Sequence, residues 1–241
     1  MKASIGTWIQ IPSPDICEII GSYGLDWVAF DMEHTEMSYE TLPDMFRALR
    51  GTGTKPFVRV RNNDTIEIRR ALDIGATGVI VPLVSTAEET RNAVQAVKYP
   101  PEGKRGFSFC RANNWGRDFD EYARHANENT RVFVMAESME AVNNIQAIAD
   151  VKGLDGVFIG PYDMSASYGL LGQTKHSVLE EAYDSVLEAC KKAGKIAGKH
   201  IVTVDKAYIE KDIEKGFRMI AVGIDTLFIH NAMEEISHIR G

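Results

Sequence analysis

Three polar side chains end the apolar segment DWVAFDMEH: Asp31, Glu33 and His34. A histidine changes its charge near neutral pH and is therefore a common proton carrier, while carboxylates orient such a base or bind a cation. A single histidine beside acids is more often a satisfied hydrogen-bonding group. We therefore interpret this segment as part of an acid–base site that needs other reactive groups beside it.

Two further carboxylates stand directly after apolar segments: Glu137 ends RVFVMAE and Asp163 lies in FIGPYD. Carboxylates without cysteine or paired histidine suit a hard divalent cation such as Mg²⁺ or Mn²⁺, whose remaining ligands are water or substrate oxygens. Taken separately, Asp163 could cap a helix and Glu137 could pair with an arginine. Because both acids are expected near an arginine and a histidine, we favour a metal site.

Arg59 closes the segment KPFVR, at the end of an apolar stretch. A charge there needs an anionic partner, because an unpaired buried charge is costly. One hypothesis is a structural ion pair with Asp73 or Glu33. The other is a clamp on a carboxylate or enolate oxygen of a substrate. The segment alone leaves both hypotheses open.

Apolar, β-branched segments alternate with amphipathic ones along the whole chain. The predicted strands are 5–10, 27–32, 56–60, 78–83, 132–137, 156–160, 196–201 and 219–222. The predicted helices are 41–50, 66–74, 87–97, 120–126, 141–149, 179–193, 206–215 and 226–239. Most of these strands are apolar on both faces, as in a parallel sheet that is covered on both sides. About eight strand–helix units predict an α/β fold, a (β/α)8 TIM barrel, with a doubly wound sheet as the alternative.

A barrel of this type carries its chemistry at the carboxyl ends of its strands, which is where the polar groups above fall. The chain of 241 residues contains no evident linker or repeat, so we expect a single domain over residues 1–241. The irregular stretch 99–129 is unusually long, and loops of that length in compact domains tend to be functional.

The composition argues against several classes of protein. A net charge of −7 and a pI near 5.4 disfavour a nucleic-acid binder, because phosphate contacts need a basic face. A small anion remains possible where a local arginine or metal outweighs the total charge. No apolar stretch approaches the roughly 18 residues of a membrane span. The three cysteines lack paired spacing, which favours reduced thiols and a cytoplasmic protein.

The segments that carry these residues resemble the HpcH/HpaI aldolase family, the class II pyruvate aldolases related to citrate lyase β subunits. The matching segments are GLDWVAFDMEH, KPFVRVRNND, ALDIGATGVIVPLV, YPPEGKRG, VMAESMEAV, GLDGVFIGPYDMSASYG and MIAVGIDT. The resemblance implies reversible, metal-dependent cleavage of a 4-hydroxy-2-oxo acid to pyruvate and an aldehyde. The substrate would be a 2-keto-3-deoxy sugar acid or of the 4-hydroxy-2-oxoheptanedioate type. It also implies a last helix exchanged with a neighbouring subunit, in a homohexamer built as a trimer of dimers.

The resemblance also implies a role for individual residues. Glu137 and Asp163 would bind the divalent cation, which is Mg²⁺, Mn²⁺ or Co²⁺. Arg59 would hold the keto oxygen of pyruvate and stabilise the enolate. His34 would be the acid–base residue, with Asp73 as its partner, either in the same chain or across a subunit boundary. Asp31 would lie near the aldehyde, and the pyruvate carboxylate would be bound by the backbone of Gly160, Pro161 and Tyr162.

Three departures from the family pattern concern the site. Met135 stands where relatives usually carry glutamine, the loop 106–116 is bulkier, with Phe109 and Cys110, and GKH at 198–200 replaces an apolar stretch. Substrate choice is therefore not transferred from any relative.

Three alternative functions remain open at this stage. Lys199, at a predicted strand end, could form a Schiff base with a keto acid, as in class I aldolases. A citryl- or malyl-CoA-type lyase on the same barrel would need a basic groove, for which the only strong cluster is Lys104 and Arg105. The last alternative is a barrel without catalytic activity.

Overall fold

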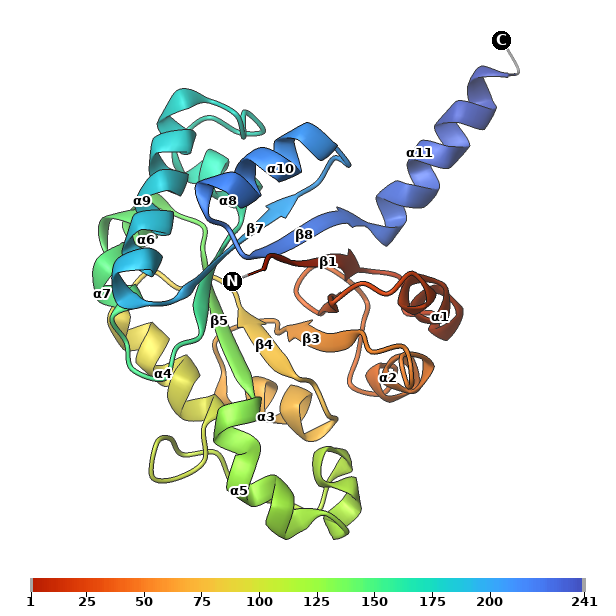
Figure 1. Ribbon diagram of the computed structural model, residues 1–241, viewed down its shortest axis with the longest axis vertical. Coiled ribbons are helices and arrows are strands. Elements are labelled where there is room, and N and C mark those ends of the chain that lie inside the picture. Colours follow the sequence, from red (N-terminus) through yellow and green to blue (C-terminus); the bar gives the residue numbers. More distant parts are fainter. Residues whose placement is uncertain (1, 240–241) are drawn as a thin grey trace.

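The computed structural model describes residues 2–239, which form a closed barrel of eight parallel strands (Figure 1). Each strand pairs with the next along the chain, and β8 closes the barrel on β1. The strands are β1 (Ser4–Ile9), β2 (Trp27–Asp31), β3 (Lys55–Arg59), β4 (Gly78–Val81), β5 (Arg131–Ala136), β6 (Gly156–Ile159), β7 (Ile196–Ile201) and β8 (Met219–Ile224). The predicted TIM-barrel fold is confirmed, and the doubly wound sheet is excluded by the closure.

Helices surround the barrel. They are α1 (Pro14–Ser22), α2 (Leu42–Ala48), α3 (Thr65–Asp73), α4 (Ala87–Val97), the 3-10 helix η1 (Arg111–Gly116), α5 (Phe119–Asn129), α6 (Met139–Asn143), α7 (Ile145–Ala149), α8 (Pro161–Ser167), α9 (Ser177–Ala193), α10 (Lys206–Lys215) and α11 (Asp225–His238). Side-chain capping explains where several of these helices begin. The Asp64 carboxylate caps α3 by accepting two backbone N–H groups, and Thr86 with Glu89 forms a capping box on α4.

Two elements of the structure differ from the predicted ones in a way that local backbone geometry explains. The helix predicted over 141–149 is two short helices, because Asn144 (φ −98°, ψ 5°) leaves the helical conformation. The strand predicted over 78–83 stops at Val81, because Pro82 has no N–H to donate and Leu83 has a left-handed backbone with φ of 57°. This turn brings the Leu83 backbone to the upper rim of the barrel.

Four aromatic rings fill the lower barrel, and each faces a glycine at the same register on the neighbouring strand. The pairs are Trp27 with Gly6, Phe57 with Gly78, Phe133 with Gly156, and Phe158 with Gly198. A Cβ atom added at any of these glycines would lie 2.3–2.6 Å from the facing ring. The rings pack edge to face, so the interior is a solid core on which the polar rim rests.

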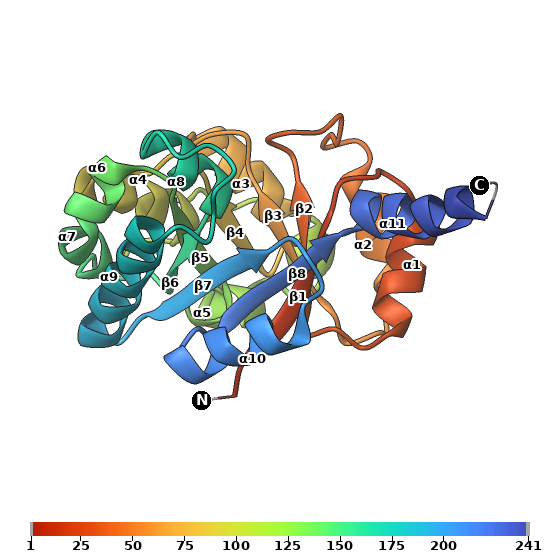
Figure 2. The ribbon, with the colours of Figure 1, turned by 90° about the horizontal axis from the view of Figure 1, so that it is seen from above.

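The last helix, α11, leaves the barrel after its first turn and projects away from it (Figures 1 and 2). Its apolar side chains Phe228, Ile229, Met233 and Ile236 are exposed. Exchange of this helix with a second subunit stays a prediction. Within residues 2–239, no helix has both the length and the apolar character that crossing a membrane requires.

Candidate active site

The alternation of side chains along the strands delivers three reactive groups to the barrel mouth. Successive side chains point to opposite faces of a sheet, so a residue two positions after an inward one also faces inward. Each of the three reactive residues follows an interior residue by two positions: Asp31 follows Ala29, Arg59 follows Phe57, and Glu137 follows Met135. Met135 is therefore part of the apolar interior, one layer below the Glu137 carboxylate.

Arg59 is buried and paired with two acids of the neighbouring strand end. Its Nε and Nη2 donate to the two carboxylate oxygens of Asp31 at 3.0 and 2.7 Å, and its Nη1 lies 3.1 Å from Glu33 Oε2. The guanidinium also stacks over the Trp8 ring, 4.5 Å from the ring centre. Of the two acids predicted for an ion pair, Glu33 is confirmed. Asp73 was the wrong alternative, because it pairs with Arg105 instead.

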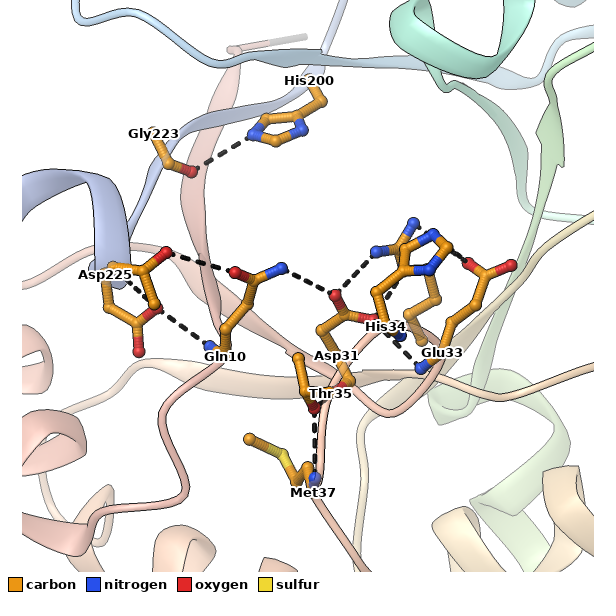
Figure 3. Close-up of polar contacts among 11 residues, drawn as sticks. Gln10, Asp31, Glu33, His34, Thr35, Met37, His200, Gly223 and Asp225 are labelled. Carbon is orange, nitrogen blue, oxygen red and sulfur yellow. Dashed lines mark hydrogen bonds and ion pairs between the residues drawn. The ribbon is translucent and has the colours of Figure 1, made fainter.

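Asp31 connects Arg59 to the start of the chain (Figure 3). Gln10 Nε2 donates to Asp31 Oδ2 at 3.0 Å, and the backbone N–H groups of Glu33 and His34 approach Oδ1 at 3.1 and 3.3 Å. Burial alone would raise the pKa of the Asp31 carboxyl, but the hydrogen bonds and charge of Arg59, with those from Gln10 and His34, hold the pKa below its usual value. Asp31 is therefore a fixed anion that orients Arg59.

Glu137 follows β5, two strands along the barrel from Arg59 on β3, and forms no ion pair with a described residue. Its Oε2 accepts the Leu83 N–H at 2.9 Å, and a Cβ atom on Gly160 would come within 2.6 Å of its Oε1. Burial, together with the charges of Glu33 and Asp163, raises the pKa of the Glu137 carboxyl to about 7. The backbone on two sides thus holds this carboxylate in a fixed position.

Asp163 lies in the first turn of α8, and its side chain is exposed. The helix N-cap is Gly160, so the alternative that Asp163 is itself the N-cap is wrong. Among residues 2–239, neither Asp163 nor Glu137 takes part in an ion pair, so the predicted alternative of a Glu137–arginine pair is not formed either. Burial is the main cause that raises the pKa of the Glu33 and Glu137 carboxyls, and the charge of Asp163 adds to both shifts.

The donor set fits a hard divalent cation. The mouth holds four carboxylates, those of Asp31, Glu33, Glu137 and Asp163, and Arg59 forms ion pairs with the first two. The other two offer only oxygen atoms, which Mg²⁺ and Mn²⁺ prefer. The described part of the chain holds no group of three or more His, Cys, Asp or Glu side chains arranged for a metal. An ion here would complete its coordination with water or substrate oxygens.

His34 lies at the edge of the same cluster, with an exposed side chain. Its Nε2 is 3.6 Å from Glu33 Oε2. Asp73, the predicted partner of His34, lies at the end of α3, where Arg105 Nη2 donates to it at 2.8 Å. Within one chain the structure therefore brings His34 to Glu33 and not to Asp73, and a pairing across a subunit boundary stays a prediction.

Lys199 does not reach the barrel mouth. Its neighbours Gly198 and His200 contact the interior rings Phe158 and Trp8, so Lys199 points outward between β7 and the helices. Its ammonium lies 3.0 Å from Asp212, and burial lowers its pKa. The Schiff-base alternative thus lacks its nucleophile.

The basic cluster considered for a CoA groove has only one of its two members, Lys104, on the surface. Arg105 is buried at 2% exposure, paired with Asp73 and stacked on the Tyr99 ring. Phe109 and Cys110 line a cavity beside Asp73 rather than the mouth that holds Arg59 and Glu137. Within one chain they do not narrow the candidate site.

His200, from the unusual segment GKH at 198–200, faces the barrel mouth beside Trp8. Two other contributors to the site were missed by the sequence analysis: Gln10 orients Asp31, and the Leu83 N–H holds Glu137. Gln10 ends a predicted strand at an inward position, so the alternation was an available signal. The Leu83 amide had no signal, because a backbone N–H carries no residue type.

A closed parallel barrel with acids and an arginine gathered at the carboxyl ends of its strands has the architecture of a TIM-barrel enzyme. A family model described as HpcH/HpaI aldolase/citrate lyase matches residues 4–232. The chain belongs to this family.

Relatives with assigned names agree with this family membership. The chain is 35% identical to the 4-hydroxy-2-oxo-heptane-1,7-dioate aldolase of Shigella sonnei over 98% of this chain and 90% of that protein. The crystal structure of an HpcH/HpaI aldolase/citrate lyase family protein from Burkholderia cenocepacia superposes with a TM-score of 0.93 at 31% identity, covering 100% of this chain and 95% of the other. These relatives identify the chain as a carbon–carbon lyase of the aldolase type.

A more distant structure shows the fold alone. The citrate lyase beta subunit from M. tuberculosis, complexed with oxaloacetate and magnesium, has a TM-score of 0.58 at 16% identity, with 93% of both chains covered.

Proposed function

We propose that this protein is a divalent-metal-dependent aldolase that reversibly cleaves a 4-hydroxy-2-oxo acid to pyruvate and an aldehyde. The observation that carries the proposal is the pair Glu137 and Asp163. They lie on adjacent strand–helix units of the barrel mouth, they have no ion-pair partner among the described residues, and the charge of Asp163 helps to raise the pKa of the Glu137 carboxyl. A structural role would have matched them with cations.

Glu137 and Asp163 would hold Mg²⁺, Mn²⁺ or Co²⁺. When bound, such an ion stabilises negative charge that develops on the oxygens of a keto acid. Its charge would also return the Glu137 carboxyl to its ionised form, since the raised pKa comes from burial and from two neighbouring acids.

Arg59 is arranged to hold a substrate oxygen. A guanidinium carries five N–H donors, of which two donate to Asp31, while Glu33 lies at ion-pair distance from Nη1. N–H groups that Asp31 does not use can donate to the keto oxygen of pyruvate. As the C3–C4 bond breaks, its electron pair becomes the enolate of pyruvate, and the fixed guanidinium stabilises the negative oxygen.

His34 would move the proton. In cleavage it takes the proton of the C4 hydroxyl, directly or through a water, while the C4–O bond becomes the aldehyde carbonyl. In condensation it returns that proton to the new alkoxide. Asp31, which binds the His34 backbone N–H, keeps the segment in place on the aldehyde side. Asp73 of a second subunit would orient the ring.

The pyruvate carboxylate would be bound at the start of α8. The backbone N–H groups in the first turn of a helix have no partner within the helix. Here that turn begins at Gly160, Pro161 and Tyr162, next to Glu137. Gly160 N–H donates to Ala136 O and Pro161 has no N–H, so the N–H of Tyr162 is the first free donor for the carboxylate. The carboxylate would then be bound at α8, and the keto oxygen would be held from β3 by Arg59.

The proposal extends to the assembly. A homohexamer, built as a trimer of dimers that exchange α11, would cover the exposed apolar side chains Phe228, Ile229, Met233 and Ile236. Among partners, the proposal includes only small molecules, pyruvate and an aldehyde, besides other copies of the chain.

The test combines two assays on the purified protein. Exchange of the pyruvate C3 protons with solvent deuterium, followed by NMR, isolates enolate formation from aldehyde recognition. Condensation of pyruvate with glyceraldehyde, lactaldehyde, succinic semialdehyde or tartronate semialdehyde, with products identified by mass, tests the full reaction. We expect both to require Mg²⁺, Mn²⁺ or Co²⁺ and to stop with EDTA.

A matched pair of variants tests the metal ligands. Glu137→Gln should abolish both activities, whereas Glu140→Gln, an exposed acid on α6, should leave them unchanged. Proton exchange that persists in EDTA, or in the Glu137→Gln protein, would refute the proposed metal site.

A further inference from the structure

The side chain of His200 on β7 lies across the barrel mouth from Asp31 (Figure 3). Its ring lies 5.6 Å from the Trp8 ring, and Trp8 also contacts the Arg59 guanidinium at 4.5 Å from the ring centre. His200 therefore lines the same mouth as the arginine that would hold pyruvate. Pyruvate itself has no hydroxyl group, so the hydroxyl groups of a 4-hydroxy-2-oxo acid lie on the half that is not pyruvate.

The hydrogen bond at Nε2 fixes the tautomer of His200. Nε2 lies 3.2 Å from the backbone oxygen of Gly223, which also accepts from the Thr7 hydroxyl at 3.3 Å. A carbonyl oxygen only accepts, so Nε2 must carry the hydrogen. Gly223 itself is constrained, because it has φ of 67° and a Cβ atom there would lie 2.2 Å from the Phe228 ring. The orientation of its carbonyl is thus built into the fold.

The other ring nitrogen is then a bare acceptor. Burial, helped by the charge of Arg59, lowers the pKa of His200 to about 4, so the ring is neutral at ordinary pH. With hydrogen on Nε2, Nδ1 carries only a lone pair. Nδ1 has no hydrogen-bond partner among residues 2–239, and solvent reaches it. The nearest charges, Arg59 and Asp31, are paired with one another.

We propose that Nδ1 of His200 accepts a hydrogen bond from a hydroxyl group on the aldehyde half of the substrate. The preferred substrates are then 2-keto-3-deoxy sugar acids, which release a hydroxyaldehyde. The Nδ1 lone pair forms no hydrogen bond with an alkyl chain, and it repels the carboxylate of a semialdehyde such as succinic semialdehyde. This inference rests on the proposed aldolase function, and it separates this chain from the heptanedioate aldolases that it resembles.

The test compares aldehydes in the same protein sample, so that any loss of folded protein cancels. Pyruvate is condensed with glyceraldehyde, with propanal, which has the same chain length without hydroxyls, and with succinic semialdehyde. We expect the wild-type kcat/KM to be highest for glyceraldehyde. His200→Leu should lower the glyceraldehyde-to-propanal ratio about tenfold, which is the effect of losing one net hydrogen bond.

Two amide variants separate the two nitrogens of the ring. Asparagine places an amide oxygen near the Nδ1 position, so His200→Asn should keep most of the ratio. Glutamine reaches the Gly223 carbonyl but lacks an acceptor at Nδ1, so His200→Gln should behave as His200→Leu does. His125→Leu, which removes an exposed imidazole on α5, is the matched control and should not change the ratio.

Three outcomes overturn the inference: a wild-type preference for propanal or succinic semialdehyde, a ratio that His200→Leu changes less than twofold, or a His200→Gln protein that keeps the ratio. Pyruvate proton exchange by the wild-type protein distinguishes a failure of the His200 inference from a failure of the aldolase proposal. If exchange is present and the ratio fails, only the role of His200 is wrong. If exchange is absent, the aldolase proposal fails, and this inference fails with it.

Discussion

Replacing Gly160 by alanine should displace the Glu137 carboxylate while leaving every reactive group in the chain. The added Cβ atom would lie 2.6 Å from Glu137 Oε1, 2.9 Å from its Cγ and 3.1 Å from its Cδ. Ordinary contact begins at 3.4 Å, so the oxygen must move by about 0.8 Å (3.4 − 2.6). The bond from the Leu83 N–H at 2.9 Å resists this movement, and so does burial.

Misplacing a catalytic group by about 1 Å can cost on the order of 100-fold in rate. We therefore expect Gly160→Ala to lower kcat/KM for pyruvate condensation by about that factor and to raise the metal concentration needed for half-maximal activity. The assay is a titration with Mn²⁺ at fixed pyruvate and aldehyde, with circular dichroism to check the fold.

Gly106→Ala is the matched control, because a Cβ atom there meets its nearest neighbour only at 4.0 Å. An unchanged Mn²⁺ requirement in Gly160→Ala, with activity within twofold of wild type, would show that the position of the Glu137 carboxylate does not matter. That result would contradict its assignment as a metal ligand.

Four further predictions follow from the same geometry. Arg59→Ala should abolish both cleavage and pyruvate proton exchange, and it should lower the free energy of unfolding in urea by about 3 kcal/mol or more, because Asp31 stays buried without its partner; normal turnover would refute the role of Arg59. His34→Ala should reduce cleavage by about 10²–10⁴-fold while leaving Mn²⁺ affinity, measured by calorimetry, within a few-fold. Because the native pKa of His200 is lowered from 6.5 to about 4, the unfolded state binds a proton that the native state does not as pH falls from 6.5 towards 4. Stability should therefore fall over that window by up to about 1.4 kcal/mol per pH unit from this group, and His200→Asn should flatten the slope. Met233→Asp on α11 should dissociate the assembly in native mass spectrometry, and an unchanged mass would count against exchange of that helix.

The sequence predicts the barrel and the collection of acids at its mouth for a single reason. In a parallel barrel all strand ends meet, so Asp31, Arg59 and Glu137 need only follow their strands to come together. The period-2 alternation then selects which side chains face inward. The same alternation places Lys199 on the face opposite Gly198 and His200, and the contacts of these two residues with Phe158 and Trp8 show that their face is the inward one.

The pairing of Arg59 could not be predicted in the same way. Asp31, Glu33 and Asp73 are all acids that could pair with Arg59. Which of them does so depends on the register between neighbouring strands. In the structure Asp31 stands directly opposite Arg59 in the β2–β3 register, which a single sequence does not encode locally. The Leu83 amide was unpredictable for another reason, because its position depends on a left-handed backbone angle at a residue that rarely adopts one.

The pairing of each aromatic ring with a glycine in the lower barrel has a consequence for how this protein can change over time. Enlarging Gly156 collides with Phe133, while shrinking Phe133 opens a void beside Gly156, so either substitution alone is penalised. Changes in the lower barrel, the barrel floor, should therefore occur as paired substitutions of a ring and its facing glycine. Single substitutions at the mouth are not bound by this pairing and can alter substrate choice. New specificities can arise above a floor that remains nearly fixed.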